Sequence, residues 1–390
     1  MEESKIPARI VDIFRAHIGW NTTIASALAS HITAMQKTPQ NPMWHGEGDV
    51  WTHTELVLDA LTADPDYQAQ DARHRAILFV AALLHDVAKP VCTVYENGVP
   101  TSPRHTIRGA AMARTFLWRD CGLCGTPSAQ SFRETVCALV RHHGMPWHLG
   151  ERQDPERKLI QVAALGEVAP DFSLALLHIL VRADLLGRVA ADTAEKLADT
   201  DWAFLLATEL GIQTSPYRFP NLAAKHAYLG GKQVARDYPL HDTTWGEVVL
   251  VAGLPGTGKD HYIRHHFPDL AVLSPDEIRR EMHISPADRT AQGKVFAEAH
   301  ARAAALLRAN RPFVWNATNL SPQLRQKQLD LFRRYGAATR IVFLETDMET
   351  EFARNRGRDA TVPPAVILHM LQKTEPPTPD EAYLVEWLCT

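Results

Sequence analysis

The chain has 390 residues, of which 45% are hydrophobic and 22% are charged, and its formal net charge at pH 7 is −4. This length predicts two or three domains, and this composition excludes wholesale disorder and a fibrous protein. A slightly acidic chain does not coat nucleic acid by bulk charge, although a local basic groove remains compatible with it.

The first half of the sequence is predicted to be helical. Ile77, Val80 and Leu84 recur at helical spacing, and Pro90 ends this pattern. Residues 171–188 are apolar on nearly every face, which indicates a buried helix. No alternating strand pattern of useful length is found in this half of the sequence.

A change of pattern marks a domain boundary. Residues 216–245 contain several prolines and the paired glycines Gly230 and Gly231, which suit a connector. Beyond them, short β-rich runs alternate with helical stretches, as in parallel βαβ units. These runs begin at Val248, Ala271, Pro312 and Arg340. We therefore predict a multidomain chain with an all-α domain (residues 1–215), a connector (216–245) and an α/β domain with a parallel sheet (246–390).

Histidines and aspartates in the helical half have the composition of a metal site. Asp86 and Asp184 interrupt apolar helical stretches, where a buried carboxylate costs several kcal/mol unless it is paired or binds a metal. Imidazoles and carboxylates together are ligands for Mn, Fe, Co, Ni or Zn in sites with open positions. The predicted ligands are His53, His85, Asp86, His105, His142, His143 and Asp184. The choice within the His142–His143 doublet is open, and His143, next to Gly144, is favoured.

We expect this set to hold two ions, with Asp86 as the bridge between them. One ion has His53, His85 and Asp184, and the other has His105 and one histidine of the doublet. Two such ions generate hydroxide near neutral pH and clamp a phosphate. The alternative for any one of these histidines alone is a satisfied core residue.

Two cations accompany the predicted ligands. Lys89 lies four residues after His85, and Arg188 lies four residues after Asp184, so each is predicted to share a helical face with its ligand. Either cation could neutralise charge on a scissile phosphate. Lys89 and Arg188 are therefore predicted catalytic residues.

The ordered set of His, His-Asp, His, His and Asp resembles the HD-domain phosphohydrolase superfamily over roughly residues 40–200. The resemblance implies an all-α fold. It also implies hydrolysis of phosphomonoesters or phosphodiesters.

The segment GLPGTGKD follows a predicted strand and precedes a helical stretch, which is the setting of a phosphate-binding loop. Backbone N–H groups of such a loop cradle nucleotide phosphates, and its lysine reaches the β and γ oxygens. The predicted residues for ATP (or another nucleoside triphosphate) with Mg²⁺ are Gly253, Gly256, Gly258, Lys259 and Asp260. Asp260 replaces the usual Ser or Thr, and a carboxylate can bind Mg²⁺ directly or through water. A structural glycine-rich turn is the alternative.

Residues beyond the loop are typical of a small kinase. Asp276 can accept the proton of an acceptor hydroxyl, and Arg279 can hold a phosphate of the acceptor. The alternative for Asp276 is a helix N-cap. Residues 315–325 resemble the third-strand motif of small P-loop kinases, in which an acidic residue often stands at the position of Asn316. Arg354, Arg356 and Arg358 look like an arginine lid over the γ-phosphate, or else a solvated face.

Residues 246–390 resemble P-loop polynucleotide kinases of the phage end-healing type, and the whole chain resembles a bacterial family of fused end-healing enzymes. The resemblance implies phosphorylation of 5′-hydroxyl ends of RNA or DNA, and removal of 2′,3′-cyclic, 2′- or 3′-phosphate from the other end. A nucleic-acid ligase could then seal the ends. The alternatives are an enzyme of mononucleotides or small metabolites, and an ATP-sensing regulator.

The sequence also predicts a cytoplasmic protein. No apolar run approaches the roughly 20 residues that cross a bilayer. The first ten residues lack the basic-then-apolar pattern of a secretory signal. The five cysteines are an odd and sparse set, and the CxxC formed by Cys121 and Cys124 lacks a second pair, so we expect buried thiols.

Overall fold

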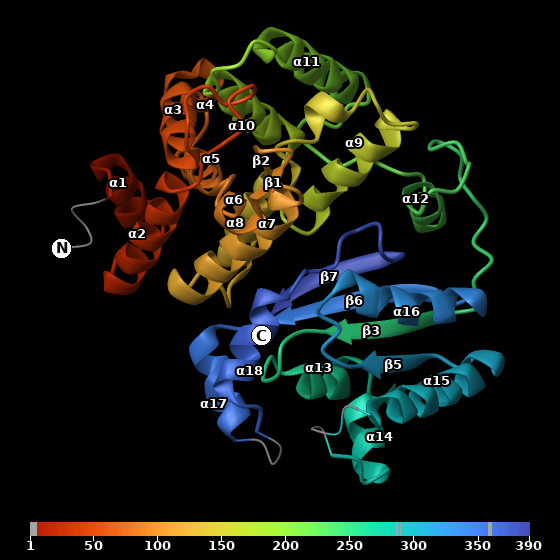
Figure 1. Cartoon of the computed structure of the whole chain (residues 1–390). Helices are drawn as coiled ribbons and strands as arrows, with labels where there is room; N and C mark the ends of the chain where they lie inside the picture. Colours follow the sequence, from red (N-terminus) through yellow and green to blue (C-terminus); the bar gives the residue numbers. More distant parts are fainter. Residues whose placement is uncertain (1–5, 286–287, 289, 358–360) are drawn as a thin grey trace. The chain divides into compact units, whose positions relative to one another are not determined.

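The structure, a computed structural model, describes residues 6–285, 288, 290–357 and 361–390. The chain divides into two compact units, Met1–Tyr217 and Arg218–Thr390. The predicted order, a helical domain followed by an α/β domain with a parallel sheet, is confirmed (Figure 1).

The first unit is a bundle of α-helices. They are α1 (Ala8–His17), α2 (Thr22–Gln36), α3 (Val50–Ala63), α4 (Pro65–Gln68), α5 (Ala72–Leu84), α6 (Lys89–Cys92), α7 (His105–Thr115), α8 (Pro127–His142), α9 (Pro155–Ala163), α10 (Leu174–Leu186) and α11 (Thr193–Glu209). Because α5 and α10 are apolar on nearly all faces, both lie buried inside the unit. No helix in the described part of the chain is long and apolar enough to span a membrane.

Two helices end earlier than the sequence pattern suggested. Helix α5 stops at Leu84, and the chain turns before α6 begins at Lys89, with Pro90 in its first turn. Helix α10 stops at Leu186. The prediction that Lys89 and Arg188 share a helical face with His85 and Asp184 is therefore wrong, because each cation lies beyond its helix.

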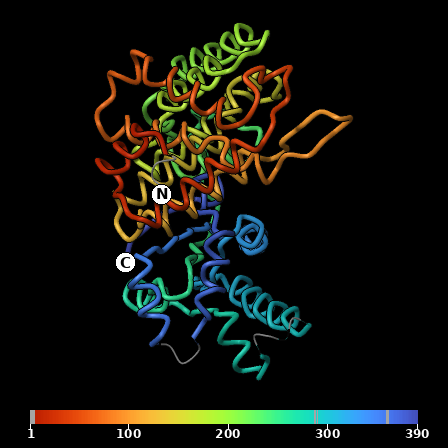
Figure 2. Tube along the Cα trace, turned by 60° about the vertical axis from the view of Figure 1, so that its left-hand side comes forward, coloured from red at the N-terminus to blue at the C-terminus, as the bar shows by residue number. Residues whose placement is uncertain are grey.

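The first unit also contains a small antiparallel hairpin, which the sequence analysis missed. Its strands β1 (Val94–Glu96) and β2 (Val99–Thr101) have three residues each, too few for an alternating pattern. Figure 2 shows the hairpin, in orange, projecting away from the helices around it.

The second unit is built on a five-stranded parallel sheet in the order β4-β5-β3-β6-β7. The strands are β3 (Glu247–Ala252), β4 (Ala271–Leu273), β5 (Phe313–Asn316), β6 (Ala338–Glu345) and β7 (Leu384–Cys389). The helices are α12 (Leu222–Leu229), α13 (Lys259–His266), α14 (Pro275–Glu281), α15 (Gln292–Arg308), α16 (Pro322–Arg334), α17 (Met348–Arg356) and α18 (Pro364–Gln372). Buried side chains such as Val249, Val251 and Val342 form its core.

Two parts of this unit differ from expectation. The edge strand β7, which pairs with β6, was not predicted. The predicted connector contains a helix, α12, in which Ala224 and Leu229 are buried. The boundary between the two units lies near the start of the predicted connector, between Tyr217 and Arg218. In a parallel sheet all strands point the same way, so the segments that follow β3, β4 and β5 lie together at the C-terminal ends of these strands.

Candidate metal centre and phosphate-binding loop

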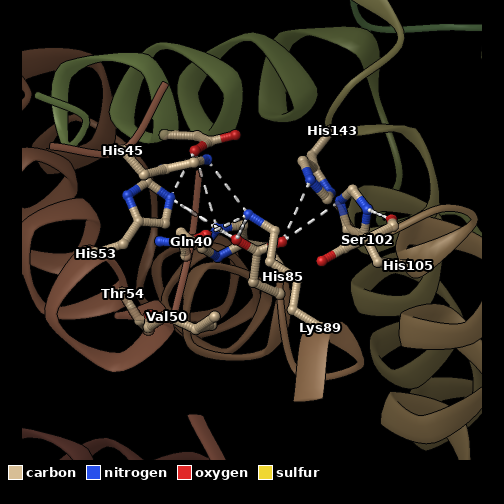
Figure 3. Close-up of polar contacts among 12 residues, drawn as sticks. Gln40, His45, Val50, His53, Thr54, His85, Lys89, Ser102, His105 and His143 are labelled. Atoms are coloured by element: carbon tan, nitrogen blue, oxygen red, sulfur yellow. Dashed lines mark hydrogen bonds and ion pairs between the residues drawn. The ribbon is translucent and has the colours of Figure 1, made fainter. Parts of the chain in front are cut away.

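Five helical segments of the first unit bring imidazoles and carboxylates to one place (Figure 3). His53 lies on α3, His85 and Asp86 follow α5, His105 begins α7, His143 follows α8, and Asp184 lies on α10. All except His105 have exposed fractions of 4% or less. Buried charges persist only when they are paired or bind a metal, so these carboxylates must be paired with the imidazoles and with Lys89 or bind a metal ion.

One side of the cluster contains four of the predicted ligands. Asp86 Oδ2 lies 3.1 Å from His85 Nε2 and 3.8 Å from His53 Nε2. Asp184 Oδ1 lies 3.0 Å from His53 Nε2 and 3.8 Å from His85 Nε2. Two imidazole nitrogens and two carboxylate oxygens therefore converge on one point.

The other carboxylate oxygen of Asp86 faces a second pair of histidines. Asp86 Oδ1 lies 3.5 Å from His105 Nε2 and 4.0 Å from His143 Nε2. This oxygen is buried and has no hydrogen-bond partner among the described residues. A buried carboxylate oxygen without a donor fits a metal ion, so the two sides have the arrangement expected of a bridging carboxylate.

Backbone carbonyls fix the orientation of three of the imidazoles. The Nδ1 atoms of His85, His105 and His143 lie 2.7, 2.8 and 2.8 Å from the carbonyl oxygens of Ala82, Ser102 and Val140. When Nδ1–H donates to a carbonyl, the lone pair of Nε2 points to the centre, as in histidines that bind metals. Burial lowers the pKa of His143 to about 4, which keeps its imidazole in the neutral, metal-binding form.

His53 is oriented by a carboxylate instead, Glu47, which the sequence analysis missed together with His45. Glu47 Oε1 lies 2.9 Å from Nδ1 of both histidines, and Val189 N–H donates to Glu47 Oε2. Burial alone would lower the pKa of His53, but hydrogen bonds to Asp184 and Glu47 raise it to about 9. So much negative charge around one imidazole is the environment of a cation site. The available signal was an acid between two glycines just before the helix of a predicted ligand.

The two predicted cations lie in different environments. Lys89 Nζ is 2.7 Å from Asp86 Oδ2 and 2.6 Å from Gln40 Oε1. Burial raises the pKa of Asp86, but Lys89 and His85 hold it well below its usual range. Arg188 forms an ion pair with Asp192 and lies over the ring of Trp147. Of the two cations, Lys89 is the one in contact with the carboxylate cluster.

The structure separates the two histidines of the doublet. His143 faces Asp86, whereas burial and the positive charges of Lys158 and Arg141 hold the pKa of His142 well below its usual range. His142 is in none of the potential metal-binding groups found among the described residues. The structure thus brings His143, and not His142, to the cluster.

The doublet makes a matched pair of variants. His143→Ala removes one imidazole nitrogen, Nε2, from the predicted metal ligands and should weaken Mn²⁺ binding at least about tenfold. His142→Ala should leave Mn²⁺ affinity unchanged, because this residue is in none of the potential metal-binding groups among the described residues. Calorimetric titration of both variants with Mn²⁺ checks the expectation, and equal losses in the two variants would contradict it.

In the second unit, the glycine-rich segment joins the end of β3 to α13. Gly253 has φ +143° and Gly256 has φ +93°. A Cβ atom at these positions would lie 2.5 Å from Leu344 O and 2.6 Å from Glu351 O, so only glycine fits. Lys259 Nζ donates to the carbonyls of Gly253 and Leu254 at 3.0 and 2.8 Å, which holds the ammonium against its own loop.

The predicted acceptor-side residues lie in the first turns of α14. Ser274 is the N-cap of this helix, so the alternative that Asp276 is the cap is wrong. Asp276 is exposed and forms an ion pair with Arg279, whose Nε donates to Gln292 Oε1 at 2.9 Å. These contacts hold the Arg279 guanidinium, which in turn orients the Asp276 carboxylate.

The predicted lid lies partly on α17. Arg354 Nη1 donates to Thr390 Oγ1 at 3.2 Å, and a Cβ atom on Gly258 would lie 3.3 Å from this nitrogen. Arg354 is therefore next to the loop. Arg356 is exposed at the end of α17. Arg358 lies outside the described residues.

Glu351 is a buried acid beneath the loop that the sequence analysis missed. Its exposed fraction is 0%, and both carboxyl oxygens lack hydrogen-bond partners among the described residues. Burial raises its pKa to about 8, with Glu345 and Asp347 adding to the effect and Lys259 opposing it. The folded unit therefore favours the neutral carboxyl.

Glu351→Gln should change how stability depends on pH. A folded pKa above the unfolded one gives stability that is complete below about pH 4.3 and lost as the pH rises through 8. The amide cannot ionise, so the variant should melt above the wild type at pH 9 and close to it at pH 5. Thermal melts at both values check this. Glu349→Gln, exposed on the same helix, is the control, and a gain independent of pH would contradict the expectation.

Comparisons with known proteins agree with the division of the chain into two units. Residues 50–163 match the HD domain family, and residues 248–377 match a family of AAA domains. The multifunctional CCA protein of Halorhodospira halophila (strain DSM 244 / SL1) is 31% identical over 109 residues, which are 28% of this chain and 22% of that protein. The chain thus spans less than a quarter of the length of this relative. This chain has an N-terminal HD domain and a C-terminal P-loop kinase-like domain.

Two solved structures are similar to part of the chain. A candidate kinase from Chloroflexus aurantiacus J-10-fl is 16% identical, with a TM-score of 0.31, and covers 37% of this chain and 86% of its own. A gluconokinase from Sinorhizobium meliloti 1021 is 17% identical, with a TM-score of 0.27, and covers 38% and 85%.

Proposed function

We propose that this chain is a bifunctional enzyme that heals nucleic-acid ends. The second unit transfers phosphate from ATP to a 5′-hydroxyl end, and the first unit removes 2′,3′-cyclic, 2′- or 3′-phosphate from the opposite end. The observation that carries the proposal is that one chain contains two different candidate sites for phosphate chemistry. A buried imidazole–carboxylate cluster is centred on Asp86, and a glycine loop ends at Lys259.

In the hydrolase half, the chain's own residues bind the metal and position the phosphate. His53, His85 and Asp184 would hold one divalent ion of the Mn, Ni, Co, Fe or Zn type, and His105 and His143 a second, with Asp86 between them. Bound ions of this kind supply Lewis acidity and lower the pKa of water. Lys89, which lies beside Asp86 Oδ2, would neutralise charge on a phosphate oxygen.

In the kinase half, the glycine-rich loop follows β3 and α14 follows β4, so both lie at the C-terminal ends of the parallel strands. The loop's N–H groups and Lys259 bind the triphosphate, and Arg354 next to Gly258 neutralises charge on the transferred phosphoryl group. Asp276, oriented by Arg279, accepts the proton of the attacking hydroxyl. Mg²⁺ with ATP completes this site.

The β1–β2 hairpin supports a polymeric substrate. Thr93 and Ser102 at its base are hydrogen-bonded to each other, and Ser102 also holds the ring of His105. Tyr95 on the hairpin is 64% exposed, and Arg108 on α7 is exposed as well. An exposed aromatic ring can stack a base, and an arginine can contact backbone phosphates. Because Ser102 joins the base of the hairpin to His105, we propose that a nucleic-acid end bound at His105 runs along the hairpin and α7.

The test uses an oligonucleotide with a 5′-hydroxyl and a 2′,3′-cyclic phosphate. Incubated with labelled ATP, Mg²⁺ and either Mn²⁺ or Ni²⁺, it should gain a labelled 5′-phosphate and lose the cyclic phosphate. Mapping both termini shows each half separately. Preferential turnover of a free nucleoside would indicate an enzyme that acts on mononucleotides or small metabolites. ATP binding without phosphate transfer would indicate an ATP-sensing regulator. Either result would overturn the proposal.

The products suggest where the enzyme acts. A 5′-phosphate and a 3′-hydroxyl are the ends that a nucleic-acid ligase joins, so we propose a ligase in the same pathway and RNA or DNA ends as the partners. We propose that the enzyme acts in the cytoplasm.

A further inference from the structure

We infer that Asp260 and Asn316 have exchanged the roles that the phosphate loop and its neighbouring strand usually have in binding Mg²⁺. In P-loop NTPases, a loop Ser or Thr and a strand Asp hold this ion. Here the carboxylate comes from the loop helix and the neutral oxygen from the strand. The inference rests on the proposed nucleotide-binding function of the second unit.

The two residues are in direct contact. Asp260 is the second residue of α13, directly after Lys259, and Asn316 is the last residue of β5. Asn316 Nδ2 donates to Asp260 Oδ1 at 2.7 Å. The two positions at which this chain departs from the usual pattern therefore form one pair.

The sheet holds Asn316 firmly beside the loop. Strand β5 pairs with β3, so that Asn316 lies opposite Val251. Just beyond, Gly253 N–H donates to Thr318 O at 3.0 Å, and Asn319 Nδ2 donates to Val251 O at 2.9 Å. Hydrogen bonds thus join the end of β5 to the start of the loop, and the Asn316 amide, 9% exposed, is fixed against Asp260.

Charge explains why the two departures occur together. Mg²⁺ in nucleotide sites takes hard oxygen ligands, commonly one or two carboxylates with phosphate oxygens and water. The usual pair offers one carboxylate and one neutral oxygen, and Asp260 with Asn316 offers the same. Two aspartates at this separation would repel each other, whereas Ser with Asn would supply no carboxylate. The exchange keeps the charge of the pair at −1.

The test measures nucleotide binding in the full chain rather than phosphate transfer. Calorimetry gives the affinity for the β,γ-imido analogue of ATP with Mg²⁺ and with EDTA, and the ratio is the gain from Mg²⁺. Asp260→Asn keeps the shape of the side chain but removes its charge, and it should reduce this gain at least about tenfold. The exposed Asp269, just beyond α13, provides the control Asp269→Asn, which should leave the gain unchanged.

Restoring the usual pair provides the decisive variant. Asp260→Ser should lose the gain from Mg²⁺, and combining it with Asn316→Asp should restore most of it, since the carboxylate then returns to the strand. The inference is overturned if Asp260→Asn keeps the full gain, or if the double variant, folded by its thermal melt, binds no better than Asp260→Ser. Because the readout is binding, the pattern can hold even if no acceptor is ever phosphorylated.

Discussion

Lys259→Ala should abolish ATP-dependent phosphorylation while leaving phosphate release by the first unit intact. Lys259 Nζ lies 3.0 and 2.8 Å from the carbonyls of Gly253 and Leu254, across the loop that would hold the phosphates. Removing one preorganised donor from a developing charge commonly costs roughly 10²- to 10³-fold in rate. We expect at least this loss in transfer of labelled phosphate from ATP to a 5′-hydroxyl oligonucleotide.

The control for this variant is a lysine of the same unit that lies away from the loop. Lys294 is exposed on α15, and Lys294→Ala should keep both activities. Removal of cyclic phosphate, followed on the same oligonucleotide, should be unchanged in Lys259→Ala. A folded Lys259→Ala protein that has lost both activities would argue against two independent sites.

The residues near one another in sequence were the predictable part of these sites. Glycine spacing and the strand before it place Gly253, Gly256 and Lys259 in one local turn, whose geometry depends on few distant contacts. The His85-Asp86 doublet is local in the same sense. The buried position of Asp184 followed from its helix, because α10 is apolar on nearly every face.

Contacts between segments distant in sequence were not predictable in this way. Glu47 Oε2 accepts a hydrogen bond from Val189 N–H, which is 142 residues away in the chain, and this bond holds the carboxylate that faces His53. Glu351 approaches the glycine loop only because α17 packs beneath it. The bond between Asp260 and Asn316 depends on β5 lying next to β3, which the order of the strands in the sequence does not reveal.

Helix ends were a further difficulty. Apolar spacing continues through Val87, but the helix stops at Leu84 and a turn carries His85 and Asp86. The turn lets the Asp86 carboxylate face histidines from three other segments. Lys89, three residues after Asp86, contacts this carboxylate.

Asp86→Asn should abolish phosphate release by the first unit and leave the kinase activity of the second unit intact. Asp86 is the residue whose two oxygens face both histidine pairs, so its loss affects both sides of the cluster at once. An amide keeps the shape but offers one neutral oxygen in place of a charged pair. We expect Mn²⁺ affinity to fall at least about 10²-fold, and release of phosphate from a 2′,3′-cyclic end to become undetectable.

A stability measurement separates this effect from unfolding. Without the carboxylate, the buried Lys89 ammonium loses its ion-pair partner, and breaking a buried pair from one side costs about 3–5 kcal/mol. Asp86→Asn should therefore melt lower than the wild type, and Asp86→Asn combined with Lys89→Met should recover part of that stability without recovering Mn²⁺ affinity. Asp12→Asn, an exposed position on α1, is the control. Mn²⁺ affinity that returns with the stability would show that Asp86 serves the fold alone and would remove it from the metal centre.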